Sequence, residues 1–481
     1  MLTIALIALP VLIALALFIN GPKYARPIAI GAAVVELALV IFAFVQHHQG
    51  MTGLLYFDQS WMVSAGISFS FGLDGISLLL VLLSAIAAPL ILWTIDEAKF
   101  RNPHIFYGLI LLMIGGMIGA FTATDGLIFY VFYELSLIPI YFIILIWSNS
   151  ERKLAVTMKF FLYTLFGSLF MLIALLYVYQ HTADHSFAME SLYRAGRSLS
   201  VTEQGLVFGG IFLAFAVKMP IFPFHTWQPS TYNIAPTAGT MLLAAVMLKM
   251  ATYGVIRLIV PMVPDGLEEY KNWAIGLSVL GILYASGMAI AQKNYKLLIA
   301  YSSIAHVGLI SAGILSANEQ GIQGGLIEMF SHGILAIALF YVYDLLESRF
   351  GSDAMHSMGG VREVNPLFAF LFFVIVMGSV ALPLTSGFVG EFLLIAGLAK
   401  HSMIYAGVAG LTVILSAVYM LRAFQTMMLG SATSRSQLFT ALTKKEIAIL
   451  SVLIFIVVAV GVFPKPLLDL TAGSVQEILI R

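Results

Sequence analysis

The chain has 481 residues, of which 60% are hydrophobic and only 10% are charged, with 24 Lys and Arg against 24 Asp and Glu. Soluble domains carry about 25% charged residues, so a soluble fold has no place for this much apolar surface, and the surrounding solvent must be largely lipid. The zero net charge argues against a nucleic acid partner. The lack of cysteine excludes disulfides, iron–sulfur clusters and thiolate metal sites within this chain.

Apolar stretches long enough to cross a bilayer follow one another along the whole chain. A helix needs about 20 such residues to span the hydrocarbon core. The predicted spans are residues 2–20, 27–46, 73–94, 106–123, 126–148, 157–180, 205–220, 236–262, 273–291, 297–317, 322–347, 366–398, 403–427 and 446–464. The first lacks the basic region and cleavage site of a signal peptide, so we expect a retained helix. We therefore predict an all-α, polytopic transmembrane bundle of about fourteen spans. In the loop before the third span, residues 66–72 alternate in a way that favours a strand.

Lys and Arg residues are distributed unevenly over the loops between these spans. With the N-terminus outside, the odd-numbered loops face the cytoplasm and hold fourteen of them, while the even-numbered loops and the tail hold six. The fourteen are Lys23, Arg26, Lys99, Arg101, Arg152, Lys153, Lys159, Lys293, Lys296, Arg349, Arg362, Arg435, Lys444 and Lys445. The six are Arg194, Arg197, Lys271, Lys400, Lys465 and Arg481. Because cytoplasmic loops carry an excess of Lys and Arg, we predict both termini on the outer side.

Two of the predicted spans are interrupted by proline. The segment VKMPIFPFHTW places Pro220 and Pro223 in the seventh span, and SVALPLTSGFVGEF places Pro383 in the twelfth. Proline removes a backbone donor and clashes with the preceding turn, and in lipid the freed carbonyls need protein or cavity water. Paired breaks in corresponding halves are typical of inverted-repeat transporters and point to their ion path.

The positions of charged residues favour an internal repeat. Glu134 precedes Lys218 by 84 positions, and His306 precedes Glu391 by 85. The two sets are 172 positions, or five spans, apart, and an odd number of spans inverts the second copy. We therefore predict N-terminal spans 1–3 in residues 1–105 and a first repeat of spans 4–8 in 106–262. A second, inverted repeat of spans 9–13 is expected in 273–427, and span 14 with the tail in 428–481.

Ionisable residues within or at the breaks of the spans are the candidate functional groups. They are Glu134, Lys218, Lys249, His306, His332 and Glu391. A charged side chain at the centre of a membrane helix costs about 2.5–3.5 kcal/mol on the insertion scale, so partners or water are expected. Burial disfavours a charged lysine and a neighbouring glutamate favours it, so a lysine that gains and loses such a neighbour exchanges its proton. These residues are therefore candidate proton carriers that need no metal or redox group.

Purely structural roles for single residues remain alternatives to the proton-carrier interpretation. Lys218 and Lys249 also suit structural ion pairs, and His306 or His332 taken alone suits a packing role. Their shared depth in the membrane favours the proton path over both.

Five other charged residues within the spans are assigned less specifically. Glu328 and Asp344 belong either to the same polar stripe or to local caps. Arg422 either gates an ion path or reaches to the interface. Glu36 and Arg257 are expected to be structural.

Over nearly its whole length the chain resembles a known family, the proton-translocating membrane subunits of respiratory complex I and of multisubunit cation/proton antiporters. The matching stretches are FGLDGISLLL, FYELSLIPIYFII, VKMPIFPFHTWQPSTYNIAPTAGTMLLAAVMLKMATYGVIR, NYKLLIAYSSIAHVG, MFSHGILAIALFY, MGGV and LTSGFVGEF. The stretch from Lys218 to Arg257 is the most specific of them. The segment WQPSTYNIAP differs from the commoner WLPDAH-type motif of the family at residues 228–234, where the resemblance places a half-channel entrance.

The resemblance assigns a family position to each candidate carrier. Glu134 matches the glutamate of the fifth span, Lys218 the lysine of the broken seventh span, and Lys249 the lysine of the eighth. His306 and His332 match the histidines of the tenth and eleventh spans. At the broken twelfth span most members carry lysine, whereas the M-type subunits of complex I carry glutamate, as this chain does at Glu391. The chain also ends soon after span fourteen, without the long lateral helix of the L-type subunits.

By resemblance, the chain is expected to be a non-redox, proton-translocating subunit of NADH:quinone oxidoreductase, a translocase. Glu134 would set the charge of Lys218, which would take a proton from a cytoplasmic half-channel. Lys249 and His306 would pass it along the membrane mid-plane to Glu391, and it would leave through span twelve or the neighbouring subunit. No cofactor is expected in this chain. FMN, iron–sulfur clusters and quinone would be held by partner subunits.

The same resemblance implies a membrane assembly and leaves two other assemblies open. The expected partners are the L- and N-type antiporter-like subunits and the lipid bilayer, with no nucleic acid, in the bacterial inner membrane. A subunit of a multisubunit sodium/proton antiporter is the alternative, against which Glu391 argues, and a membrane-bound hydrogenase subunit is another.

Overall fold

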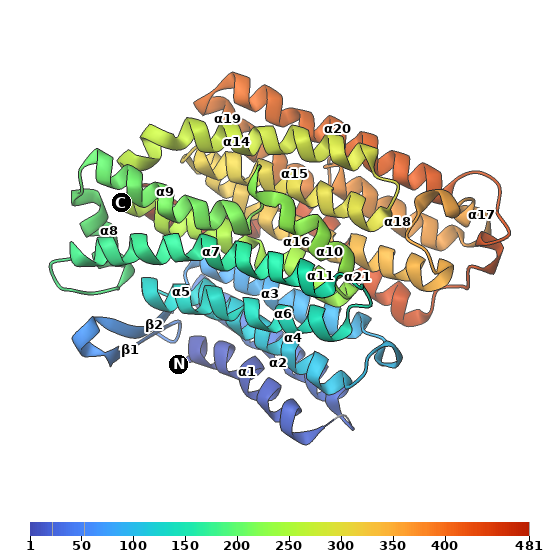
Figure 1. Ribbon diagram of the computed structural model, residues 1–481, viewed down its shortest axis with the longest axis horizontal. Helices are drawn as coiled ribbons and strands as arrows, with labels where there is room; N and C mark the ends of the chain where they lie inside the picture. Colours follow the sequence, from blue (N-terminus) through green and yellow to red (C-terminus); the bar gives the residue numbers. More distant parts are fainter. Residues whose placement is uncertain (22, 52, 481) are drawn as a thin grey trace.

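The computed structural model describes residues 1–21, 23–51 and 53–480, which form one bundle of long helices that run roughly alongside each other (Figure 1). Arg481, one of the six outer cations counted above, lies outside the described residues. In Figure 1, the helices at the lower edge of the bundle come from the N-terminal part of the chain and those at the upper edge from the C-terminal part. The middle of the chain lies between them.

The helices and strands have the following bounds. The first part forms α1 (Leu2–Asn20), α2 (Ala25–His48), β1 (Tyr56–Met62), β2 (Ile67–Gly72), α3 (Gly75–Thr94), α4 (Pro103–Thr122), α5 (Gly126–Leu135), α6 (Leu137–Trp147), α7 (Lys153–Gln180), α8 (Met189–Ser198) and α9 (Val201–Lys218). The middle forms the 3₁₀ turn η3 (Phe224–Trp227), α10 (Gln228–Ile234), α11 (Thr237–Leu242), the π-helical η4 (Leu243–Met247), α12 (Lys249–Gly254), the π-helical η5 (Val255–Ile259) and α13 (Val260–Met262). The last part forms α14 (Pro264–Ala291), α15 (Tyr295–Leu315), α16 (Glu319–Phe350), α17 (Val361–Val364), α18 (Pro366–Ser379), α19 (Ser386–His401), α20 (Met403–Met428), α21 (Lys444–Val462) and α22 (Lys465–Ile480).

The predicted all-α membrane bundle is confirmed. Within the described residues, 13 helical segments are long and apolar enough to cross a membrane, and the shorter apolar helix Pro366–Ser379 lies in the remaining predicted span. The twelfth span, expected at 366–398, consists of α18 and α19. The chain between them has positive φ angles at Ala381 (54°) and Leu384 (77°), on either side of Pro383. Such angles are uncommon for residues other than glycine, and they separate the two helices.

Several spans are less regular than the sequence led us to expect. The seventh ends as a helix at Lys218, and the chain then passes through η3 and α10 before α11 begins. The eighth, expected as a continuous helix over 236–262, contains the π-helical segments η4 and η5 on either side of Lys249. The fifth changes from α5 to α6 at Ser136, two residues after Glu134. Irregular turns of this kind free main-chain carbonyls within the membrane.

Two features outside the spans were only partly predicted. The strand expected at 66–72 is present as β2, but its antiparallel partner β1 was not expected. The C-terminal tail, for which no element was predicted, forms the helix α22. The Ser474 side chain of α22 accepts a hydrogen bond from the Gly75 amide at the start of α3, at 3.1 Å. This contact ties the end of the chain to the third span.

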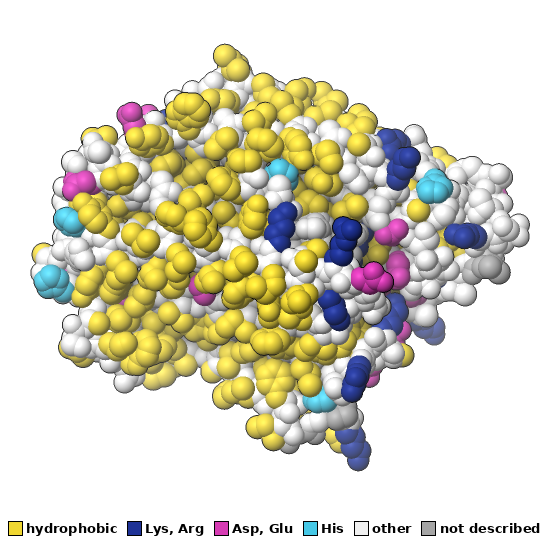
Figure 2. Space-filling model, viewed as in Figure 1, with side chains coloured by type: hydrophobic (Ala, Val, Ile, Leu, Met, Phe, Trp, Pro, Cys, Tyr) yellow, Lys and Arg dark blue, Asp and Glu magenta, His cyan; other side chains and the backbone are white. Residues whose placement is uncertain are grey.

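Charge is distributed unevenly between the two ends of the bundle. Both chain ends lie towards the left of Figure 1, on the same side as β1, β2 and α8. Figure 2 shows a wide apolar band in the middle and the Lys and Arg side chains gathered towards the opposite, right-hand end. On the side of the bundle drawn in Figure 2, the asymmetry counted along the sequence thus appears as a difference between the two ends of the bundle.

An ion pair connects the third span to the irregular eighth span. Asp74 caps α3 by accepting a hydrogen bond from the Ser77 amide (2.9 Å), and it also pairs with the Arg257 guanidinium. Arg257 further donates to the Tyr253 hydroxyl at 3.2 Å, and that hydroxyl donates to the Phe121 carbonyl at 2.8 Å. The structural role expected for Arg257 is therefore to neutralise a half-buried carboxylate.

We predict that Arg257→Met destabilises the subunit by about 1–3 kcal/mol, because it leaves the Asp74 carboxylate, whose side chain is 22% exposed, without its partner. The double variant Asp74→Asn/Arg257→Met should recover much of this loss, since neither charge then remains. The measurement is the amount of assembled complex on native gels together with its midpoint of thermal inactivation. Equal losses in the single and double variants would contradict the assignment.

Candidate functional site

Lys218 lies at the end of α9, where the helix stops, and is 1% exposed. Its Nζ donates to the Tyr133 carbonyl of α5 at 2.8 Å and lies 3.5 Å from the centroid of the Tyr133 ring. Glu134 is the next residue along α5, is partly buried, and lies within electrostatic range of Lys218 and the Ser168 hydroxyl. Among the described ion pairs, none joins Glu134 directly to Lys218. The predicted influence of Glu134 on Lys218 therefore acts across a short gap, while a neutral carbonyl and an aromatic face hold the ammonium.

Lys249 begins α12 directly after the π-helical segment η4 and is 1% exposed. Its Nζ donates to the Ala244 carbonyl within η4 at 2.6 Å and lies 2.7 Å from Nδ1 of His332 on α16. Further along α12, the Thr252 hydroxyl donates to the Lys249 carbonyl at 3.1 Å and the Tyr253 hydroxyl donates to the Phe121 carbonyl at 2.8 Å.

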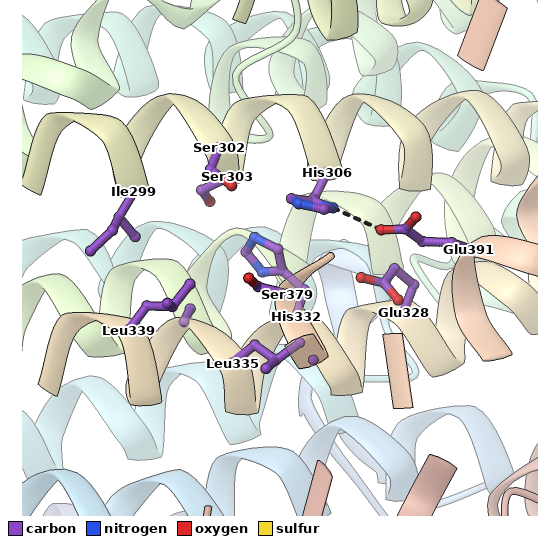
Figure 3. Close-up of a pocket in the computed structure, with 12 residues that line it drawn as sticks. Ile299, Ser302, Ser303, His306, Glu328, His332, Leu335, Leu339, Ser379 and Glu391 are labelled. Carbon is purple, nitrogen blue, oxygen red and sulfur yellow. Dashed lines mark ion pairs between the residues drawn. The ribbon is translucent and has the colours of Figure 1, made fainter. Parts of the chain in front are cut away.

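Two histidines continue from Lys249 towards the twelfth span. The rings of His332 and His306, from α16 and α15, lie with their centroids 6.0 Å apart. His306 Nδ1 then lies 3.1 Å from Oε1 of Glu391, which projects from α19 just after the broken span. Figure 3 shows the three side chains converging from three different helices. The structure thus brings Lys249, His332, His306 and Glu391 into one series of neighbouring side chains, which we call the carrier row.

Glu328 also reaches the end of the carrier row. It is 2% exposed, projects from α16 one turn before His332, and points towards Glu391 in Figure 3. Atoms of His306, Glu328 and Glu391 lie within 4.8 Å of one another. A cavity of about 20 Å³ beside them is lined by hydroxyls such as those of Ser303 and Ser379, which is room for about one water molecule.

The other charged residues left open by the sequence lie away from the carrier row. Asp344 is 4.0 Å from Lys99, near the opposite end of α16. Arg422 donates to the Gln292 carbonyl at 3.0 Å in an exposed position. Glu36 is buried in α2, and its carboxylate oxygens have no hydrogen-bond partner among the described residues. Of these residues, Glu328 alone joins the row.

The arrangement is suited to moving protons. Lysine, histidine and carboxylate groups exchange protons readily, and here they succeed one another at distances that a direct contact or one water molecule bridges. The partners Tyr133 and Ala244, whose main-chain carbonyls hold the two lysines, were missed by the sequence analysis. The only signal for Tyr133 was its position next to Glu134, and a carbonyl partner leaves no signal in residue types.

Comparisons with known proteins show the family to which the chain belongs. The family described as "NADH:quinone oxidoreductase/Mrp antiporter, TM" matches residues 123–416, which include the whole carrier row. A protein of Rickettsia conorii named NADH-quinone oxidoreductase subunit M is 36% identical over 466 residues, 96% of this chain and 94% of the relative.

Solved structures show the same architecture. A chain in "Respiratory complex I from Thermus thermophilus with bound NADH" matches with a TM-score of 0.89 and 31% identity, covering 100% of both chains. A chain of the Mrp complex from Dietzia sp. DQ12-45-1b matches with a TM-score of 0.86 at 21% identity, covering 100% of this chain and 98% of that one. At that identity the second likeness shows the fold alone. The chain belongs to the family of NADH:quinone oxidoreductase and Mrp antiporter membrane subunits, and within it to the M-type subunits of complex I.

Proposed function

We propose that this chain is a proton-translocating subunit of NADH:quinone oxidoreductase, and that its protons move along the carrier row. The observation that carries the proposal is the series from Lys249 through His332 and His306 to Glu391. Lys249 Nζ lies 2.7 Å from His332 Nδ1, the two histidine rings lie 6.0 Å apart between centroids, and His306 Nδ1 lies 3.1 Å from Glu391 Oε1. A purely structural charge network has no need of two histidines between a lysine and a glutamate. The relatives named subunit M of this oxidoreductase support the assignment.

In the proposed path, Lys218 receives a proton through the break in the seventh span. Its contacts are the Tyr133 carbonyl and ring, which stabilise an ammonium without supplying a fixed negative charge. The charge on Lys218 therefore responds to the state of Glu134 nearby. The proton then passes to Lys249 and along the carrier row to Glu391. It leaves through the twelfth span or into a neighbouring subunit.

The remaining parts of the proposal concern the assembly and its orientation. The gathering of Lys and Arg at the end opposite the termini supports a cytoplasmic position for that end and an outer position for both termini. The N-terminal spans in 1–105, the two inverted repeats in 106–262 and 273–427, and the last span in 428–481 stay a prediction. Redox groups would lie in partner subunits, and the L- and N-type subunits would be the neighbours in the bilayer.

We expect Lys218→Met to lower proton pumping, and with it the coupled oxidation of NADH, by on the order of tenfold or more, because the first carrier is removed. Lys218→Arg keeps a positive charge that does not release its proton, so it should be as inactive as the methionine variant. Acidification of proteoliposomes and NADH oxidation are measured on preparations matched for assembled complex. Full pumping by Lys218→Met would contradict the proposal.

Glu134→Gln should also reduce pumping, by several-fold, because the amide has nearly the same shape but no charge to act on Lys218. Glu36→Gln is the matched control, since Glu36 is also a membrane carboxylate but lies outside the path. The control should pump like the wild type. An equal loss of pumping in Glu134→Gln and Glu36→Gln would mean that replacing any buried membrane carboxylate has this effect, and it would contradict a specific role for Glu134.

A further inference from the structure

Two carboxylates and a histidine meet where the carrier row ends. Glu328 and Glu391 are each 2% exposed, and His306 is 6% exposed. One ligand atom from each of the three lies within 4.8 Å of the others, and Figure 3 shows their side chains turned towards one another from α15, α16 and α19. Oε2 of Glu328 and Oε2 of Glu391 have no hydrogen-bond partner among the described residues. Two buried acceptors are therefore left facing a common space without a donor.

The packing of α16 against α19 holds the two carboxylates together. A Cβ atom added at Gly390 would lie 2.5 Å from Glu328 Oε2 and 2.8 Å from the Glu328 Cα, so only glycine allows this approach. One turn away, the hydroxyls of Ser331 and Ser386 join the same two helices at 2.8 Å. The close packing of α16 against α19 thus holds the backbones that carry the two carboxylates near each other.

The surrounding charges do not neutralise two carboxylates. From α12, Lys249 is the nearest lysine, and it is engaged by His332 and by the Ala244 carbonyl. From α15, His306 contacts Glu391, although Nδ1 and Oε1 meet without hydrogen-bond geometry. From α20, the Tyr419 hydroxyl contacts Ser302 at 3.1 Å. Two like charges this close in a buried site are not both ionised, because their repulsion adds to the cost of removing each from water.

We propose that Glu328 and Glu391 share one proton between their carboxylates, so that Glu328 is a second proton carrier at the end of the row. The shared proton supplies the donor that the two unpartnered oxygens lack. A further proton arriving through His306 makes both carboxyl groups neutral, and the release of one proton towards the exit restores the singly protonated pair. This inference rests on the proposed function for its role in pumping, but the sharing itself is a property of the resting protein.

The test compares Glu328→Gln, Glu391→Gln and Glu36→Gln in the assembled complex by infrared difference spectroscopy against the wild type. A shared proton predicts that either variant of the pair loses the same C=O stretching band of a protonated carboxyl group, because the remaining glutamate ionises beside His306 and Lys249. Glu36→Gln should not remove that band. A band that persists in Glu391→Gln would mean that Glu328 is neutral by itself, and would overturn the proposal.

A bound cation is the competing explanation, and the same experiment separates it. If an ion neutralised the pair, the wild type would lack the band, and elemental analysis of the purified complex would find a metal that Glu328→Gln loses. If Glu328→Gln does not assemble, Glu328→Asp keeps a carboxylate on α16 and should shift the band, whereas an unchanged band would exclude Glu328 from the pair. None of these readouts depends on pumping, so they stand apart from the Lys218 test.

Pumping measurements then place the pair in the path. Glu328→Gln should lower the number of protons moved per NADH oxidised. The double variant Glu328→Gln/Glu391→Gln should be no worse than Glu391→Gln alone, because the two residues act as one unit. Normal stoichiometry in Glu328→Gln, with its infrared band lost, would remove the second-carrier role.

Discussion

The structure depends on one constraint, namely that each cation placed inside the membrane bundle needs a partner that the bundle itself supplies. An unpartnered charge costs several kcal/mol in such surroundings. For the lysines of the path, the partners are main-chain carbonyls: Lys218 bonds the Tyr133 carbonyl and Lys249 the Ala244 carbonyl. Regular α-helix engages its own carbonyls, so each lysine lies beside an interruption. The positions of these lysines therefore depend on the breaks in the helices, which supply their carbonyl partners.

Carbonyl partners explain why these lysines suit proton transfer while another buried cation does not. Arg257 is paired directly with Asp74, and guanidinium does not deprotonate in proteins, so this pair is a fixed structural link between α3 and η5. Lys218 and Lys249 have neutral partners, and their charge is left to respond to mobile groups nearby. Lys296 follows the same pattern at the gap between α10 and α11, where it donates to the Ala235 carbonyl at 2.8 Å.

Much of the fold was predictable because lipid imposes a strong pattern on residue type and length. The spans, the breaks at Pro220 and Pro383 and the candidate carriers all follow from apolar runs and from charges within them. The π-helical turns on either side of Lys249 were not predictable, because nothing in the apolar run over 243–247 or 255–259 distinguishes a π turn from a regular helix. The place of Glu328 was also left open, since its role depends on how closely α19 approaches α16 at Gly390, and that is decided by packing between helices far apart in the sequence.

The central claim is that the carrier row conducts protons through its two histidines. The most direct measurement is the number of protons translocated per NADH oxidised by reconstituted complex in which His306 and His332 are both replaced by leucine, at matched assembly. The account predicts a lower ratio than in the wild type, because the leucines leave a gap between Lys249 and Glu391 that no proton carrier fills. An unchanged ratio in the assembled double variant would contradict it.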